Sequence, residues 1–239
     1  MKERLYGMDK YTLSYLPLNG DIVDEAGLTW NLNGSTTWKN GNNPLILEGK
    51  SLHLNGSADY LECQEMANIF NTIGTKDFTL EFWIYHVTNH EHACIIATRN
   101  DASLNSNMLI ACFNASPAIS LANDNSDSWS VETYGHSTSF TANLWNHFAV
   151  SKSNGVLRVF INGQSYYETS AVSKLNGTIF QVPFYIGNRH STYYGSYLNQ
   201  SNNSISHFRL SSVGRYKQSF NPYTAWYQAY KEDNILKVY

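Results

Sequence analysis

Charged residues are scarce in this sequence. They make up 15% of its 239 residues, with 16 basic and 19 acidic side chains and a formal net charge of −3. Soluble proteins average about 25%, and a protein that binds nucleic acid needs lysine and arginine clustered on one surface. The composition therefore argues against nucleic acid as the main partner. The polar surface consists mainly of Asn, Ser, Thr and Tyr, which suits neutral hydrogen-bonding ligands and is also usual in a β-protein.

Long apolar runs and cysteine are scarce as well. No window approaches the ~20 apolar residues of a membrane span, and no apolar segment of the secretory-signal type follows Met1. We therefore expect no membrane insertion and no export by the general secretory route. The three cysteines, Cys63, Cys94 and Cys112, each lie in an apolar stretch. Their odd number favours buried free thiols and synthesis in a reducing cytoplasm, while a Cys94–Cys112 disulfide stays open if their strands pair.

The dominant pattern is an alternation of apolar and polar residues, which predicts β-strands. It covers residues 77–85, 145–152, 156–161 and 204–211. In the last segment Ile205, His207 and Arg209 are expected on the face opposite Phe208 and Leu210. Asn-Gly pairs separate the strands, and the pair at 154–155 is the strongest hairpin signal. We see no amphipathic helix longer than two turns, although residues 223–230 are compatible with a short one. Many short strands with regular turns predict a sandwich or jelly roll.

Several ordered segments carry a resemblance to a known family. They are SLHLNGSADYL (51–61), DFTLEFW (77–83), LWNHFAV (144–150), LRVFING (157–163), FYIG (184–187) and ISHFRL (205–210). In this order they resemble a laminin G-like domain of the concanavalin A-like lectin/glucanase superfamily. The resemblance implies an all-β, concanavalin A-like jelly-roll sandwich of two antiparallel sheets, with ligands bound on a concave face or on rim loops. It covers residues 11–222, which leaves an N-terminal extension of residues 1–10 and an aromatic C-terminal extension of residues 223–239.

The segment that closes the domain, residues 215–222, resembles an R-Y-x-x-x-F-x-P ending found in laminin G-like domains of bacteriophage structural proteins. This resemblance implies a protein that is made in the host cytoplasm and displayed on the virion surface. The aromatic extension, residues 223–239, is expected to pack against the sandwich or against a partner.

The sequence argues against an enzyme. Glucanases of the resembled superfamily carry two catalytic Glu and an Asp on one strand, so that the carboxylates share a face. No predicted strand here carries two carboxylates on one face: Glu81 is alone on its strand, and its family counterpart is structural. A Gly-x-Ser-x-Gly nucleophile motif is also absent. We therefore predict neither catalysis nor a cofactor.

The sequence also predicts no metal site. Pentraxins of the same fold bind calcium through an acidic loop, but the corresponding residues 187–192 contain no acid. The resemblance leaves Asp59 as a candidate for a structural ion, although Ser206 and His207 stand where its partner would be acidic. His86, His90 and His92 with Glu91 could bind zinc or nickel, but solvated loop histidines are the favoured interpretation.

Two loops have the composition of a carbohydrate site, which pairs an apolar floor with a few placed polar groups. The candidate residues are Asn123, Asp124, Trp129 and Tyr134 in the first loop, and Asn188, Arg189, His190, Tyr193, Tyr194 and Tyr197 in the second. Exposed tyrosines favour binding, and the alternative is that they form a subunit interface. Trp83 and Trp145 are expected in the core, and Trp30 and Trp38 are expected to be partly buried.

These observations lead to one function and two alternatives. The first hypothesis is a non-enzymatic, lectin-like phage virion protein that binds carbohydrate on host or mucosal surfaces. The second is a structural virion protein, either a capsid decoration or a fibre component, whose exposed loops make protein–protein contacts. It would bind virion proteins or other copies of itself through one sandwich face or the C-terminal extension. The third is a cellular glycan-binding protein exported without a signal, or a fragment of a larger secreted enzyme.

Overall fold

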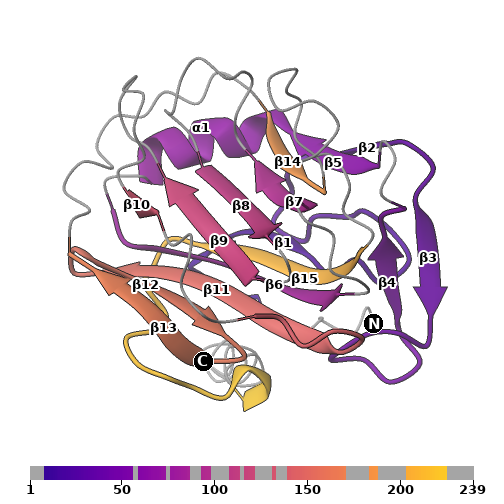
Figure 1. Ribbon diagram of the computed structural model, residues 1–239. Helices are drawn as coiled ribbons and strands as arrows, with labels where there is room; N and C mark the ends of the chain where they lie inside the picture. Colours follow the sequence, from indigo (N-terminus) through magenta and orange to yellow (C-terminus); the bar gives the residue numbers. More distant parts are fainter. Residues whose placement is uncertain are drawn as a thin grey trace, which may run out of the picture.

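The computed structural model describes residues 8–55, 59–73, 76–86, 93–97, 108–113, 116–121, 131–132, 139–170, 183–187 and 203–224. They form two antiparallel sheets that face each other across one core (Figure 1). The all-β sandwich predicted from the alternating pattern is therefore confirmed. No helix in these ranges is long and apolar enough to cross a membrane.

The larger sheet, sheet A, has eight strands in the order β13-β12-β11-β6-β15-β4-β3, with β1 paired to β15. Its strands are β1 (Thr12–Leu16), β3 (Thr37–Asn40), β4 (Lys50–His53), β6 (Phe78–His86), β11 (Trp145–Ser153), β12 (Val156–Ile161), β13 (Gln164–Thr169) and β15 (Asn203–Ser211). Sheet B has seven strands in the order β10-β9-β8-β7-β14-β5-β2. They are β2 (Asn31–Asn33), β5 (Tyr60–Cys63), β7 (Ala93–Ala97), β8 (Met108–Phe113), β9 (Ser116–Leu121), β10 (Val131–Glu132) and β14 (Phe184–Ile186).

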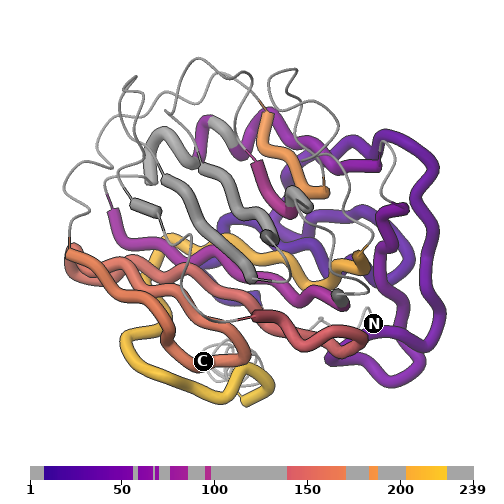
Figure 2. The backbone as a smooth tube through the Cα atoms, in the orientation of Figure 1, coloured from indigo at the N-terminus to yellow at the C-terminus, as the bar shows by residue number. Residues whose placement is uncertain are grey.

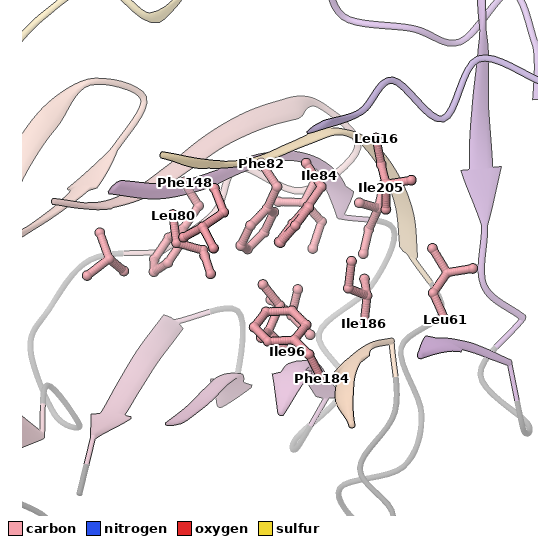
Figure 3. Close-up of a cluster of buried hydrophobic side chains, with 14 of the residues drawn as sticks. Leu16, Leu61, Leu80, Phe82, Ile84, Ile96, Phe148, Phe184, Ile186 and Ile205 are labelled. Atoms are coloured by element: carbon pink, nitrogen blue, oxygen red, sulfur yellow. The ribbon is translucent and has the colours of Figure 1, made fainter. Parts of the chain in front are cut away.

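The core lies between the sheets and follows directly from the alternation. Leu80, Phe82 and Ile84 of β6 point inward and meet Phe184 and Ile186 of β14 (Figure 3). The residues between them on β6 point outward, away from the core. Because successive side chains of a strand point to opposite faces, one pattern positions both the core and the outer surface.

The Asn-Gly hairpins are confirmed. Asn154 and Gly155 have positive φ angles of 52° and 76° and join β11 to β12, with Ser153 opposite Val156. The pair Asn162-Gly163 joins β12 to β13 in the same way, with φ angles of 50° and 76°. Two consecutive positive φ angles are the requirement of the turn type that matches the twist of a hairpin.

The structure corrects the expectation that no helix exceeds two turns. Helix α1 (Gln64–Ile73) follows β5 without a break and is ten residues long. Met66 is fully buried in the core and Ile69 packs against it. Residues 66, 69, 70 and 73 have helical spacing, but the preceding strand runs directly into them and no separate N-cap marks the boundary. Glu65 in the first turn interacts favourably with the helix dipole.

The structure also corrects the side-chain pattern of β15. The register between β15 and β6 shifts between Ser206 and Arg209, and His207 has a φ angle of 51°. One extra residue is accommodated there as a β-bulge. Ile205 therefore points into the core together with Phe208 and Leu210, whereas strict alternation had placed it with His207 and Arg209.

Two tryptophans differ from expectation. Trp145, expected in the core, is only half-buried on the outer face of sheet A, where its Nε1 donates a hydrogen bond of 3.0 Å to Asn42. Trp30, expected to be partly buried, lies in the core. Trp38 is partly buried, as expected, and Trp83 is buried, although it points outward from sheet A.

The prediction of a buried free thiol is confirmed for Cys63, the cysteine whose side chain the structure describes. Cys63 is a buried free thiol, and burial raises its pKa to about 11. Strands β7 and β8 do pair, but Cys94 stands opposite Ala111 and Cys112 opposite Ala93, so the two cysteines are not register partners.

Residues 212–224, here called the C-terminal strap, cover the outer face of sheet A beside β11, β12 and β13 (Figure 2). Tyr216 and Phe220 stack on each other with ring centroids 3.6 Å apart, and Phe220 packs against Phe160. Arg215 makes two hydrogen bonds of 2.7 Å to Asp9. The arginine, tyrosine and phenylalanine of the R-Y-x-x-x-F-x-P ending thus attach the strap to the sheet. At its end Tyr223 contacts Trp83, with ring centroids 4.7 Å apart, and residues 225–239 lie outside the described part of the chain.

Gly163 holds the strap close to the sheet, because its backbone carbonyl accepts a hydrogen bond from Phe220. A Cβ atom at Gly163 would lie 1.9 Å from the Phe220 carbonyl oxygen. We expect Gly163→Ala to lower the free energy of unfolding by more than the ~1–2 kcal/mol that a left-handed alanine costs. The matched control is Gly155→Ala, which has the same φ of 76° and nothing within 4 Å of its Cβ. Urea denaturation measures both variants, and equal losses would contradict the role of Gly163.

Candidate functional site

All ten predicted carbohydrate-binding residues lie outside the described residues. They are Asn123, Asp124, Trp129, Tyr134, Asn188, Arg189, His190, Tyr193, Tyr194 and Tyr197. The strands around them are described: residues 122–130 connect β9 to β10, and residues 188–202 connect β14 of sheet B to β15 of sheet A. His90, His92 and Glu91 are outside as well, and His86 is described only as the last residue of β6.

Main-chain hydrogen bonds hold the two residues that flank the 188–202 connection, Gly187 and Asn203. Gly187 has a φ of 96° and donates a hydrogen bond of 2.7 Å to the Ile95 carbonyl. A Cβ atom on Gly187 would lie 2.4 Å from the Leu54 side chain, so glycine is required there. The backbone N–H of Leu54 donates a hydrogen bond of 3.0 Å to Asn203, the first residue of β15. Main-chain hydrogen bonds to Ile95 and Leu54 therefore position Gly187 and Asn203, the residues that flank the segment with the predicted tyrosines.

The outer face of sheet B presents a set of polar and aromatic residues close to Gly187, here called the tyrosine patch. It consists of Asn31, Asn33, Tyr60, Glu62 and Tyr185. Register places Asn31 and Tyr185 on either side of Glu62, and Asn33 opposite Tyr60. The rings of Tyr60 and Tyr185 meet edge to face, with centroids 5.7 Å apart. Leu61, Phe184 and Ile186, which alternate with them, are buried in the core.

The patch combines apolar ring surface with hydrogen-bonding groups. Tyr60 and Glu62 are half-buried and Asn31 is exposed. Burial, the charge of Glu62 and the neighbouring Tyr60 raise the pKa of Tyr185, so its hydroxyl is a neutral donor. The Asn33 Nδ2 group is buried and has no acceptor among the described residues. Rings, amides and one carboxylate together suit a polyhydroxylated ligand. Sequence reasoning missed the patch, although the alternation in residues 60–63 and 184–186 already predicts that these side chains point outward.

Glu81 lies in a buried ion cluster with His147, Arg209 and Tyr216. Arg209 donates hydrogen bonds of 2.9 and 2.6 Å to Glu81 Oε1, and the Tyr216 hydroxyl donates one of 2.7 Å to Oε2. His147 Nε2 lies 3.1 Å from Oε2. Burial alone would raise the pKa of Glu81, but the charge of Arg209 and the contact with His147 lower it to about 2.

This cluster is sealed from solvent under the C-terminal strap. The side chains of Glu81 and His147 are 0% exposed and that of Arg209 is 1% exposed. A general acid or nucleophile must reach its substrate within hydrogen-bond distance, which the strap prevents here. The cluster ties the strap and three strands of sheet A together, so Glu81 has the structural role that the resemblance implied.

Asp59, the candidate for a structural ion, binds backbone groups instead. It accepts hydrogen bonds from the amides of Ser35 and Asn55, at 2.7 and 2.9 Å. Ser206 and His207, where the resemblance would place its partner, bind Pro17 and Tyr15. Within the described ranges, no three His, Cys, Asp or Glu side chains come together in a geometry that could hold a metal ion.

Comparisons with known proteins agree with the fold. The family model of the concanavalin A-like lectin/glucanases superfamily matches residues 55–213. The binding domain of botulinum neurotoxin serotype D has a TM-score of 0.63 and 14% sequence identity, over 90% of this chain and 51% of that one. A botulinum neurotoxin type C structure, of a toxin whose cell entry depends on interaction with two ganglioside molecules, has a TM-score of 0.63 and 17% identity, over 92% and 51%.

The binding domain of botulinum neurotoxin DC in complex with rat synaptotagmin II has a TM-score of 0.63 and 14% identity, over 94% of this chain and 52% of that one. No curated protein matches the sequence. This chain spans about half the length of these toxin structures. At such identities the likeness shows the shared fold alone.

Proposed function

Because this chain belongs to the concanavalin A-like lectin/glucanases superfamily, we propose that it is a non-catalytic, lectin-like module that binds carbohydrate. Its binding surface comprises the tyrosine patch and the adjoining 188–202 connection, which carries Tyr193, Tyr194 and Tyr197. The observation that carries the proposal is the geometry of the patch. Tyr60 and Tyr185 form an edge-to-face pair 5.7 Å apart beside Glu62, Asn31 and an Asn33 amide without a described acceptor.

The structural neighbours support a binding role rather than a catalytic one. They are binding domains of toxins, one acting through gangliosides and one bound to a protein receptor. A glycan is the partner that suits the neutral, tyrosine-rich surface of this chain. For its place of action we propose the surface of a phage virion, on the strength of the resemblance carried by residues 215–222.

The alternative function is a structural virion protein, and one observation favours it. Six large apolar side chains are exposed in the described part of the chain, and the three most exposed are Leu47 by 95%, Leu144 by 56% and Tyr223 by 53%. Exposed apolar groups of this kind are also found at protein–protein contacts. In this alternative, virion proteins or further copies of the chain cover them.

A glycan-array screen of the purified protein, with and without a calcium chelator, tests the proposal. We expect binding that survives chelation and weakens at least about tenfold in Tyr194→Ala and in Tyr60→Ala, because aromatic side chains dominate binding energy. The control is Tyr11→Ala, which removes an exposed tyrosine at another site and should leave binding unchanged. Loss of binding on chelation would place a metal in the site. No binding across the array would favour the structural alternative.

A further inference from the structure

A second row of polar and aromatic side chains crosses the outer face of sheet A. Register places Trp145 of β11 opposite Tyr85 of β6, Tyr85 opposite Ser204 of β15, and Ser204 opposite His53 of β4. The residues that alternate with them, Ile84, Ile205 and Leu52, are buried in the core. All four side chains of the row therefore point outward, on the side of the sandwich opposite the tyrosine patch.

Contacts between neighbouring side chains hold the row in a defined arrangement. The rings of Trp145 and Tyr85 meet edge to face with centroids 5.7 Å apart. The hydrogen bond from the Trp145 indole to Asn42 sets the orientation of that ring. His53 Nδ1 lies 3.2 Å from the Ser204 hydroxyl. Tyr85 is half-buried, and its hydroxyl is one of the polar groups of the row.

Trp145, Tyr85 and His53 stay accessible, Ser204 between them is 1% exposed, and the next outward row is covered throughout. Two residues further along the strands, His147, Trp83, Ser206 and Ser51 are all at most 1% exposed. Tyr223 of the strap covers Trp83, and Asn43 hydrogen-bonds to Ser206. The covering segments end before the first row, where Trp145, Tyr85 and His53 are each half-buried. The row thus lies where the covering segments end, and it forms a shallow platform rather than part of the core.

The chemistry of the row indicates the class of ligand. It contains no carboxylate, and burial and the charge of Lys39 lower the pKa of His53, which keeps the imidazole neutral. A half-exposed indole beside a tyrosine hydroxyl, an amide and an imidazole that Ser204 orients offers an apolar floor with several uncharged hydrogen-bonding groups. This is the composition of a site for a neutral, hydroxyl-rich ligand.

We propose that the row Trp145–Tyr85–Ser204–His53, with Asn42, is a second carbohydrate-binding surface that takes a neutral saccharide. The inference rests on the proposed function, in that the domain binds glycans, and goes beyond it in making the domain bivalent. Two sites on opposite faces allow one copy to bridge two glycan chains, so that avidity exceeds the affinity of either site.

The test follows the indole N–H signal of Trp145 by NMR, assigned through its loss in Trp145→Phe. Lactose, maltotriose and cellotriose are titrated separately into the full chain to millimolar concentration. We expect at least one of them to move this signal saturably. The movement should persist in the Tyr60→Ala/Tyr194→Ala double variant, which removes tyrosines of the first site only. It should weaken about three- to tenfold in Tyr85→Phe, which removes one hydroxyl and leaves the ring in place.

Each outcome decides between the two proposals. Binding on the glycan array without any movement of the Trp145 signal overturns the second site and leaves the proposed function standing. Movement that disappears in the double variant also overturns it, because a single site would then explain all binding. No binding in either experiment overturns both. Tyr85→Phe keeps the test interpretable even if the Tyr60→Ala/Tyr194→Ala double variant fails to fold.

Discussion

Replacing Glu81 by alanine is expected to lower the free energy of unfolding by about 3–5 kcal/mol, the loss typical when one partner of a buried ion pair is removed. The reason is Arg209, whose side chain is 1% exposed and lies 2.6 Å from Glu81. Without the carboxylate, the guanidinium is a buried cation that has lost its 2.6 Å ion pair. The Tyr216 hydroxyl also loses its acceptor, so the strap loses its innermost attachment.

Urea denaturation of the wild type and the variant measures this effect. The matched control is Glu168→Ala, which removes an ion pair with Arg158 of similar length, 2.8 Å, but with a glutamate side chain that is 56% exposed. Solvent screens such a pair, and its loss is expected to cost at most about 1 kcal/mol. If the two variants lose similar stability, the buried cluster does not hold the strap and sheet together as described.

Acidification from pH 7 to pH 5 is expected to destabilise the protein, with His207 contributing about 2 kcal/mol. His207 is buried at the bulge of β15, where its Nδ1 lies 2.7 Å from the Tyr15 hydroxyl and its Nε2 lies 3.0 Å from Asn43 Oδ1. Asn43 Oδ1 already accepts from the amides of Leu45 and Ile46, so His207 Nε2 is the donor and Nδ1 accepts from Tyr15. The neutral imidazole satisfies both hydrogen bonds, with Nε2 donating and Nδ1 accepting.

The direction of the pH effect follows from the pKa of His207 in the folded and in the unfolded chain. Burial, together with the nearby charge of Arg209, lowers the pKa of His207 from 6.5 to about 3. Between these values the unfolded chain binds a proton that the folded chain does not, so stability falls as the pH falls. The loss begins near pH 6.5 and continues to about pH 3. His147, whose pKa burial also lowers, acts in the same direction.

Denaturation curves at pH 7 and pH 5 check this for the wild type and for His207→Asn. Asparagine tolerates the positive φ of this position and cannot take up a proton. The variant should lose less stability on acidification than the wild type. His53→Asn serves as the control, because that histidine is only half-buried and should change the pH dependence less. Parallel losses in the wild type and His207→Asn would contradict the assignment.

The fold could be predicted from the sequence where apolar and polar residues alternate without interruption. Residues 77–85 alternate strictly, and β6 has the predicted faces because nothing interrupts its pairing with β11. In β15 the extra residue at the bulge is invisible to a period of two, so Ile205 was assigned to the wrong face. Helix α1 was missed because it continues a strand, and its burial depends on the core that other segments build.

The candidate site shows the same limit. Outward-pointing residues such as Tyr60 and Tyr185 could be predicted one strand at a time, but their meeting requires β5 and β14, more than 100 residues apart in the chain, to be neighbours. That pairing is a property of the topology. The buried cluster is a similar case: the family resemblance implies a structural role for Glu81, yet only the folded chain brings Arg209, His147 and Tyr216 to it. The loop residues 188–197 stay a prediction.

The main-chain hydrogen bonds that hold Gly187 to Ile95 and Asn203 to Leu54 have a consequence for how this domain can change. Gly187 and Asn203 keep their hydrogen bonds whatever sequence lies between them, because those bonds involve main-chain atoms. The energetic cost of closing a longer loop grows only slowly with its length. Recognition can therefore diversify here without disturbing the sandwich, as variable loops do on an immunoglobulin frame. A library randomised between these two anchors would turn the domain into a scaffold for selecting new binders.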